Sequence, residues 1–222
     1  MTRRESHSVS LVALAMLAAT IASAATPPAS IRGCAERLRA TRVLAERITA
    51  SGRGEARVTL TREDAMGGPP RVDHGSVALE PPDRVRLEFT ETGEKIAVRG
   101  DGGEWLQPHL RQMVRLRSEQ AGAASWLWDL FLHGGRGRFA EREAGRGRYV
   151  LALRDERGAV PETLAVSVDV AGLPAALEVS DPSSGRSTYR FTAWKFTRAR
   201  GRNAFVIRAP HGYTVAEETE RF

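Results

Sequence analysis

Cysteine, aromatic residues and long apolar runs are all scarce in this sequence. The 222 residues include one cysteine, Cys34, so no disulfide can form within the chain. Aromatic residues make up 6% of the chain, and they are not interleaved with cations as in proteins that stack single-stranded nucleic acid. The longest apolar run, Leu11 to Ala22, is shorter than the ~20 residues that a comfortable membrane span needs. A disulfide scaffold, a nucleic-acid-binding protein and a membrane-spanning chain are therefore not expected.

Recognisable catalytic and metal-binding motifs are also lacking. No serine lies in a Gly-x-Ser-x-Gly elbow, and no glycine loop ends in the Lys-Ser or Lys-Thr of a phosphate site. The histidines beyond residue 25 are too far apart for ligand spacing. Asp129 and His133 lie four residues apart, which is more typical of a pair on a helix surface than of a catalytic dyad. We therefore predict no enzyme, no metal and no cofactor.

The formal net charge is +6, and it is spread along an arginine-rich chain. Such a balance could favour an anionic membrane surface. An ordinary solvated, arginine-rich surface is the simpler account, so charge alone assigns no partner.

Residues 1–24 have the three-part layout of a secretory signal. Arg3 and Arg4 precede the apolar run, and Ala22-Ser23-Ala24 is a small-x-small cleavage motif. An anchoring helix is the alternative. We expect residues 1–24 to be removed on export to the periplasm and residues 25–222 to form a single domain. Cys34 is expected to be a buried cysteine on the first helix of that domain, with lipid attachment as the other possibility.

Most of the chain beyond residue 53 alternates apolar and polar residues, which is typical of antiparallel strands with one apolar face. Val85, Leu87 and Phe89, against Arg84 and Arg86, are the clearest case. The aromatic residues between 189 and 196 predict a strand pair. About ten strands are predicted in all, at residues 56–60, 77–79, 85–89, 96–98, 113–116, 149–153, 164–168, 177–179, 189–196 and 205–207.

Two segments have helical patterns. Residues 31–50 carry apolar residues at helical spacing, and Gly52 is expected to end that helix. Residues 121–133 would form a helix that is apolar nearly all round, which indicates a core helix or a greasy surface. The order of elements predicts a mainly β (α+β) domain, a single curved antiparallel sheet or open half-barrel with helices over one side. Any unfilled part of that sheet would be an apolar cavity suited to lipid chains, whereas a filled sandwich would have none.

Several motifs resemble the periplasmic lipoprotein carrier family (LolA-like). They are Pro81 to Phe89, Ile96 to Pro108 and Gln112-Met113-Val114, followed near the end by Gly172-Leu173-Pro174, Asp181, Phe191 and Phe205 to Gly212. Their order and spacing match the family's proline, arginine-bearing strand, Asp-Gly turn, Trp-Leu step and closing strands over most of the exported chain. The sequence differs from the family at Gln107, where a tyrosine is usual, and at His109, where an acid is common.

The resemblance implies a strongly curved half-barrel that carries acylated lipoproteins through the periplasm. It implies an inner-membrane release complex and an outer-membrane acceptor as partners, and we expect a monomer. The cavity is then lined by Val85, Leu87, Phe89, Ile96, Val98, Trp105 and Met113. The lid is formed by Trp126, Leu127, Leu130 and Phe131.

The resemblance also places the family's lid latch on Arg86. Strand alternation points Arg86 away from Val85, Leu87 and Phe89, which conflicts with a latch if those three residues line the cavity. A surface arginine is the alternative. Two other functions are compatible with the same fold: a carrier or sensor of another envelope lipid or glycolipid, and an envelope module that binds a protein partner without transporting cargo.

Overall fold

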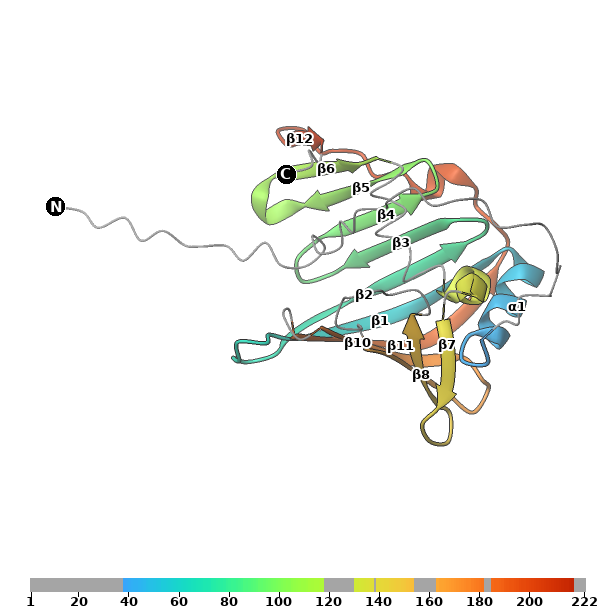
Figure 1. The fold of residues 1–222 in the computed structure, drawn as a ribbon. Helices are drawn as coiled ribbons and strands as arrows, with labels where there is room; N and C mark the ends of the chain where they lie inside the picture. Colours follow the sequence, from blue (N-terminus) through green and yellow to red (C-terminus); the bar gives the residue numbers. More distant parts are fainter. Residues whose placement is uncertain (1–37, 118–129, 138, 154–162, 182–184, 218–222) are drawn as a thin grey trace, which may run out of the picture. The chain divides into compact units, whose positions relative to one another are not determined.

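The computed structural model describes residues 38–117, 130–137, 139–153, 163–181 and 185–217 (Figure 1). All of them belong to one compact unit, Arg32–Phe222. The signal segment, Cys34 and the first part of the expected N-terminal helix lie outside the described residues, as do Trp126 and Leu127 of the expected lid. Predictions for these residues stay predictions.

The described strands form one sheet of twelve, in the order β12-β6-β5-β4-β3-β2-β1-β11-β10-β9-β8-β7. Figure 1 shows β1 to β6 side by side. The expected mainly β architecture with a single sheet is confirmed, and its curvature stays a prediction. The strands are β1 (Arg53–Glu63), β2 (Arg71–Glu80), β3 (Arg84–Phe89), β4 (Lys95–Arg99), β5 (Gly102–Gln107), β6 (Gln112–Leu116), β7 (Phe139–Glu143), β8 (Arg148–Leu153), β9 (Thr163–Val168), β10 (Pro174–Asp181), β11 (Gly185–Thr197) and β12 (Thr214–Glu217).

Alternation gives this sheet two unlike faces. The apolar face is the side that bears Val85, Leu87 and Phe89 of β3, all of which are buried. The polar face is the opposite side, which bears Arg84 and Arg86 of the same strand. The main core lies on the apolar face, where buried residues of β1, β2, β3, β9, β10 and β11 pack with α1 and with residues 130–132.

Helix α1 (Arg42–Ser51) ends where expected, at Gly52. Gly52 adopts φ +98°, a left-handed conformation that favours glycine, and its N–H donates to the Ile48 carbonyl at 2.7 Å. Residues 38–41, which were expected to be helical, precede α1, and residues 39–41 form a turn. The N–H groups of Arg39 and Ala40 donate instead to the Glu141 carboxylate of β7, at 2.9 and 2.8 Å.

Strand β11 is one strand and not the predicted aromatic pair. Its aromatic residues change phase, from Tyr189 and Phe191 to Trp194 and Phe196. The register against β1 shifts at the same place, and Ala193 takes φ +54°. This β-bulge adds one residue to β11. It therefore keeps all four aromatic side chains packed against the main core.

The C-terminal part departs most from expectation. The predicted strand at residues 205–207 is wrong, because the chain there forms a 3-10 helix, η3 (Arg202–Phe205), followed by an irregular segment. Three strands were missed, β5, β7 and β12. Strand β12 pairs in parallel with β6, whereas the other strand pairs of the described sheet are antiparallel. The remaining 3-10 helices are η1 (Pro108–Leu110) and η2 (Gly134–Gly137), and residues 130–133 form a helical turn before η2.

Candidate functional site

Six of the seven residues predicted to line a cavity share the apolar face: Val85, Leu87, Phe89, Ile96, Val98 and Trp105. The β ladders place Leu87 opposite Ile96, and Ile96 opposite Trp105. Residues directly opposite each other in antiparallel strands project from the same face. The structure therefore brings these six together, although their role in lipid binding stays a prediction.

Met113 does not share that face. It lies opposite Leu106, and it packs with Ala97, Leu106 and Ile207 in a separate buried cluster. Its neighbour Val114, opposite Trp105, is the residue of β6 that extends the apolar face. Extending the strand register from Trp105 to β6 would have identified Val114 as the residue on the apolar face. An error of one residue in that register assigns a side chain to the wrong face.

The apolar face is covered unevenly by the described elements. Helix α1 packs on β1 and β11, where a Cβ on Gly54 would lie 2.9 Å from Ile48. Phe131 packs edge-on against Phe191 of β11, with ring centroids 5.5 Å apart. Phe131 and Leu130 are fully buried. These two members of the expected lid thus belong to the main core beside β11.

A second apolar cluster continues the same face over β4, β5 and β6. Val98 and Leu116 are buried there, and Ile96 and Val114 are half-buried against them. Trp105 lies on the same face and is also half-buried. Its indole Nε1 is buried without a hydrogen-bond partner in the structure. An unpaired buried N–H is costly to the folded state.

One end of the apolar face carries charges. The Arg62 guanidinium donates to Asp73 at 2.8 Å and lies 5.9 Å from the centroid of the Phe89 ring. Glu94 lies 3.7 Å from the His109 Nδ1. Burial raises the pKa of the Glu94 carboxyl above its ordinary value, although the positive charges of Arg62 and His109 oppose that rise. A chain bound along this face would thus meet polar groups at this end.

Arg86 points to the polar face and holds the C-terminal strap, which we define as residues 198–209. Its Nη1 donates to the carbonyls of Ala204 and Val206, at 2.9 and 3.3 Å, and its Nε donates to Glu88 at 2.5 Å. Burial tends to raise the pKa of Glu88, but hydrogen bonding to Arg86 and the charges of Arg86 and Lys95 lower it overall. The described contacts of Arg86 are with the strap and with Glu88. A latch contact with the expected lid stays a prediction.

Other charged strand residues form hydrogen bonds with the backbone of the strap. The Glu80 carboxylate accepts the N–H groups of Arg200 and Gly201, at 2.8 and 3.0 Å. Arg99 donates to the Phe205 carbonyl at 2.5 Å and forms a double hydrogen bond with Glu104 at 2.7 Å. Sequence patterns gave no sign of these residues, because their acids and bases look like ordinary solvated positions until the strap is folded over them.

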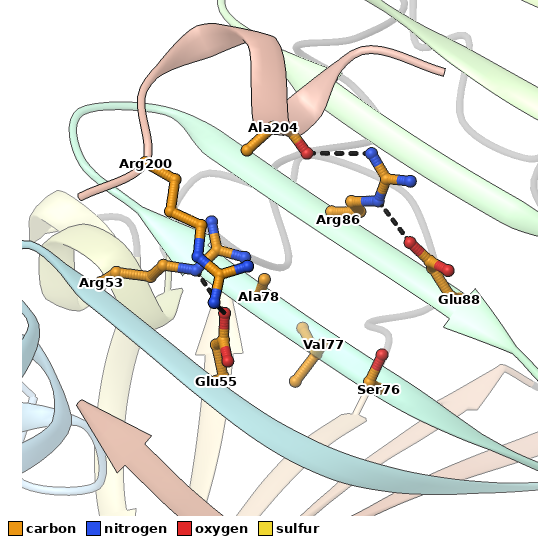
Figure 2. A pocket seen from close by; sticks show the side chains of 9 residues that line it. All are labelled: Arg53, Glu55, Ser76, Val77, Ala78, Arg86, Glu88, Arg200 and Ala204. Carbon is orange, nitrogen blue, oxygen red and sulfur yellow. Dashed lines mark hydrogen bonds and ion pairs between the residues drawn. The ribbon is translucent and has the colours of Figure 1, made fainter. Parts of the chain in front are cut away.

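Between the strap and β1–β3 lies a pocket of about 370 Å³ on the polar face, lined by Arg53, Glu55, Ser76, Val77, Ala78, Arg86, Glu88, Arg200 and Ala204. Figure 2 shows Arg53 joined to Glu55, and Arg86 joined to Glu88 and Ala204. Arg53 also lies 3.6 Å from Glu80, and Arg200 lies 3.8 Å from Glu55. The charges that line this pocket are thus largely neutralised by one another.

No cluster of His, Cys, Asp or Glu suited to a metal ion occurs in the part of the chain that the structure describes. Within that same part, no helix is both long and apolar enough to cross a membrane. The described site is therefore a sheet with an apolar face, a charged end and a polar face that binds the strap.

No known family model matches the chain, and no curated protein matches it. Solved structures do resemble it. An uncharacterized conserved protein from Thermus thermophilus has a TM-score of 0.48 and 13% identity, with 80% of this chain and 98% of that chain covered. A LolA superfamily protein from Nitrosomonas europaea has a TM-score of 0.42 and 12% identity, covering 75% and 97%. The lipoprotein LppX from Mycobacterium tuberculosis has a TM-score of 0.38 and 13% identity, covering 70% and 93%.

These three likenesses are structural, at low sequence identity, and no specific family follows from them. Since each TM-score is below 0.5, we take no function from these proteins. The functional proposal rests on the residues of this chain.

Proposed function

We propose that this protein is a periplasmic, non-enzymatic carrier that binds acyl chains on the apolar face of its sheet. Its proposed cargo is the acylated end of a lipoprotein, taken up from an inner-membrane release complex and passed to an outer-membrane acceptor. The observation that carries the proposal is the second apolar cluster over β4, β5 and β6, which continues the apolar face beyond the strands that α1 covers.

The chemistry of that cluster suits an acyl chain joined through an ester or amide. Ile96 and Val114 retain partial exposure, and each methylene of a chain buried against them contributes ~0.8 kcal/mol. The unpaired Nε1 of Trp105 lies among these residues. If a bound chain displaced the atoms that cover this N–H, a carbonyl at the head of the chain would accept a hydrogen bond from it and remove the cost of leaving it unpaired.

The proposed lid is the segment that contains Trp126, Leu127, Leu130 and Phe131. Leu130 and Phe131 are buried in the main core, so the segment leading to them would have a fixed end beside the apolar face. Closing that segment over a bound chain would shield the chain from water. The signal-like residues 1–24 support export of the protein to the periplasm.

The test is native mass spectrometry of the mature protein purified from the periplasm, followed by identification of any released lipid. Binding of a palmitoylated peptide is then measured for Val114→Asn and for its matched control Arg115→Asn. These neighbours on β6 point to opposite faces, and Val114 is half-buried whereas Arg115 is exposed. We expect Val114→Asn to weaken binding about 5- to 10-fold, through lost apolar contact and a buried amide, and Arg115→Asn to leave it unchanged.

An acylated lipoprotein bound one to one would support the proposal. A free phospholipid or glycolipid in its place would assign a different cargo to the same face. A protein that stays empty after incubation with acylated peptide would contradict lipid binding, and a protein-interaction module would then be the better account.

A further inference from the structure

The polar face carries a cluster of cations on two adjacent strands, β1 and β11. Arg57 of β1 lies opposite Thr192 of β11, and the neighbouring pairs on this face are Thr59 with Arg190 and Glu55 with Lys195. Arg57 is thus diagonal to both Arg190 and Lys195, and diagonal neighbours on adjacent strands lie ~7–8 Å apart. We call Arg57, Arg190 and Lys195 the basic triad; all three side chains are exposed.

The triad has no internal counter-charge in the described part of the chain. Glu55, which lies opposite Lys195, is hydrogen-bonded to Arg53 at 2.5 Å. Glu178 of the neighbouring strand β10 is bound to Arg148 at 2.9 Å. None of the three triad cations forms a hydrogen bond or an ion pair through its side chain with a described residue. Three cations without a described ion-pair partner add no favourable charge pair to the sheet, so the fold itself gains nothing from this arrangement.

We propose that the basic triad docks the protein on an anionic membrane surface. This inference rests on the proposed function only in that a lipid carrier must meet a membrane. A spread of exposed cations is attracted to anionic headgroups, and each Lys or Arg close to the surface contributes separately. The protein would then lie with its polar face toward the membrane, and the apolar face would point away from it.

The chemistry of the face favours a membrane over other anionic partners. The aromatic side chains of β11 pack against the main core on the apolar face, so the triad lacks the aromatic platforms that stack single-stranded nucleic acid. It equally lacks the buried aromatic anchors that dominate protein–protein interfaces. Threonines alternate with the cations on both strands, at Thr59 and Thr192. A charged surface without apolar anchors suits a partner recognised by charge density.

The test is co-sedimentation of the full mature protein with vesicles of phosphatidylglycerol and phosphatidylcholine in equal amounts, and with vesicles of phosphatidylcholine alone. The triple variant Arg57→Gln, Arg190→Gln, Lys195→Gln is compared with a control triple, Arg42→Gln, Arg71→Gln, Arg146→Gln. The control removes the same charge from exposed arginines outside β1 and β11.

We expect the wild-type protein to bind the anionic vesicles at low salt and to be released at high salt. The triad variant should lose on the order of 100-fold in partitioning, from three independent cation contributions, while the control triple loses much less. Binding of palmitoylated peptide, measured on the same samples, should be unchanged in the triad variant. This second readout separates failure of the docking surface from failure of the proposed function.

Three results would overturn the proposal. The first is a wild-type protein that does not bind anionic vesicles at low salt. The second is an equal loss of vesicle binding in the triad variant and the control triple variant, which would mean that net charge attracts the protein to the vesicle without a specific docking surface. The third is triad-dependent binding to an acidic protein together with no binding to vesicles.

Discussion

Glu80 offers the sharpest test of how the polar face holds the strap. Its side chain is 1% exposed, and it forms ion pairs with Arg84 and Arg53 while accepting two N–H groups from the strap, those of Arg200 and Gly201. Glu80→Gln keeps the shape but removes the charge, and its amide must turn an NH2 group toward at least one donor. Removing one member of a buried ion pair costs about 3–5 kcal/mol. Hydrogen bonds to a charged group contribute about 1.5–3 kcal/mol each.

We therefore expect Glu80→Gln to lower the free energy of unfolding by about 3–5 kcal/mol, as measured by urea denaturation followed by circular dichroism. The matched control is Glu178→Gln, whose partner Arg148 lies 2.9 Å away in a half-exposed pair. That pair should contribute at most about 1 kcal/mol. A loss below about 1 kcal/mol for Glu80→Gln would refute the reasoning, because solvent or a neighbour would then be replacing the carboxylate.

Limited trypsin digestion distinguishes local release of the strap from global unfolding of the protein. The strap contains Arg198, Arg200, Arg202 and Arg208, and Glu80→Gln should speed cleavage at these sites under conditions in which the sheet stays folded. Cleavage at the same rate as in the wild-type protein would show that Glu80 does not hold the strap.

Two further predictions concern the apolar face and the strand packing behind it. Because burial raises the folded-state pKa of Glu94, the contribution of this group to stability is fully present below its unfolded pKa and is lost as the pH rises through the folded value. Glu94→Gln should therefore raise the melting temperature at pH 7 and leave it unchanged near pH 4; a larger gain near pH 4 would contradict this. A Cβ on Gly75 would overlap the Glu88 carbonyl oxygen of β3, so Gly75→Ala should destabilise the protein by several kcal/mol, whereas Ser76→Ala should change its thermal unfolding by less than about 1 kcal/mol.

Local patterns predicted much of the sheet. The alternation of Val85, Leu87 and Phe89 correctly assigned β3 and its buried face, because side-chain direction in a strand has a period of two wherever the strand lies. Gly52 correctly marked the end of α1, because a left-handed residue is a local requirement. The same alternation correctly placed Arg86 on the side away from Val85 and Leu87.

Patterns failed where a distant partner decides the outcome. Residues 205–207 have side chains suited to a strand, but their carbonyls accept hydrogen bonds from distant arginines. Arg99 donates to the Phe205 carbonyl from 106 positions away, and Arg86 donates to the Val206 carbonyl from 120 positions away. Just before α1, the N–H groups of Arg39 and Ala40 donate to Glu141, about 100 residues away. Met113 was predicted to lie on the apolar face, but the register of β6 against β5 directs its side chain to the opposite face.

The sequence by itself determined the alternating strands, the end of α1 and the export-signal pattern, because each depends on residues adjacent in the chain. The tertiary structure alone decided which alternating residues share a face, which charges bind the strap and which cations remain unpaired. Those outcomes depend on strand register and on contacts between residues about 100 positions apart. Such contacts form only when the whole sheet assembles, since the entropy of closing long loops is offset by many pairings made together.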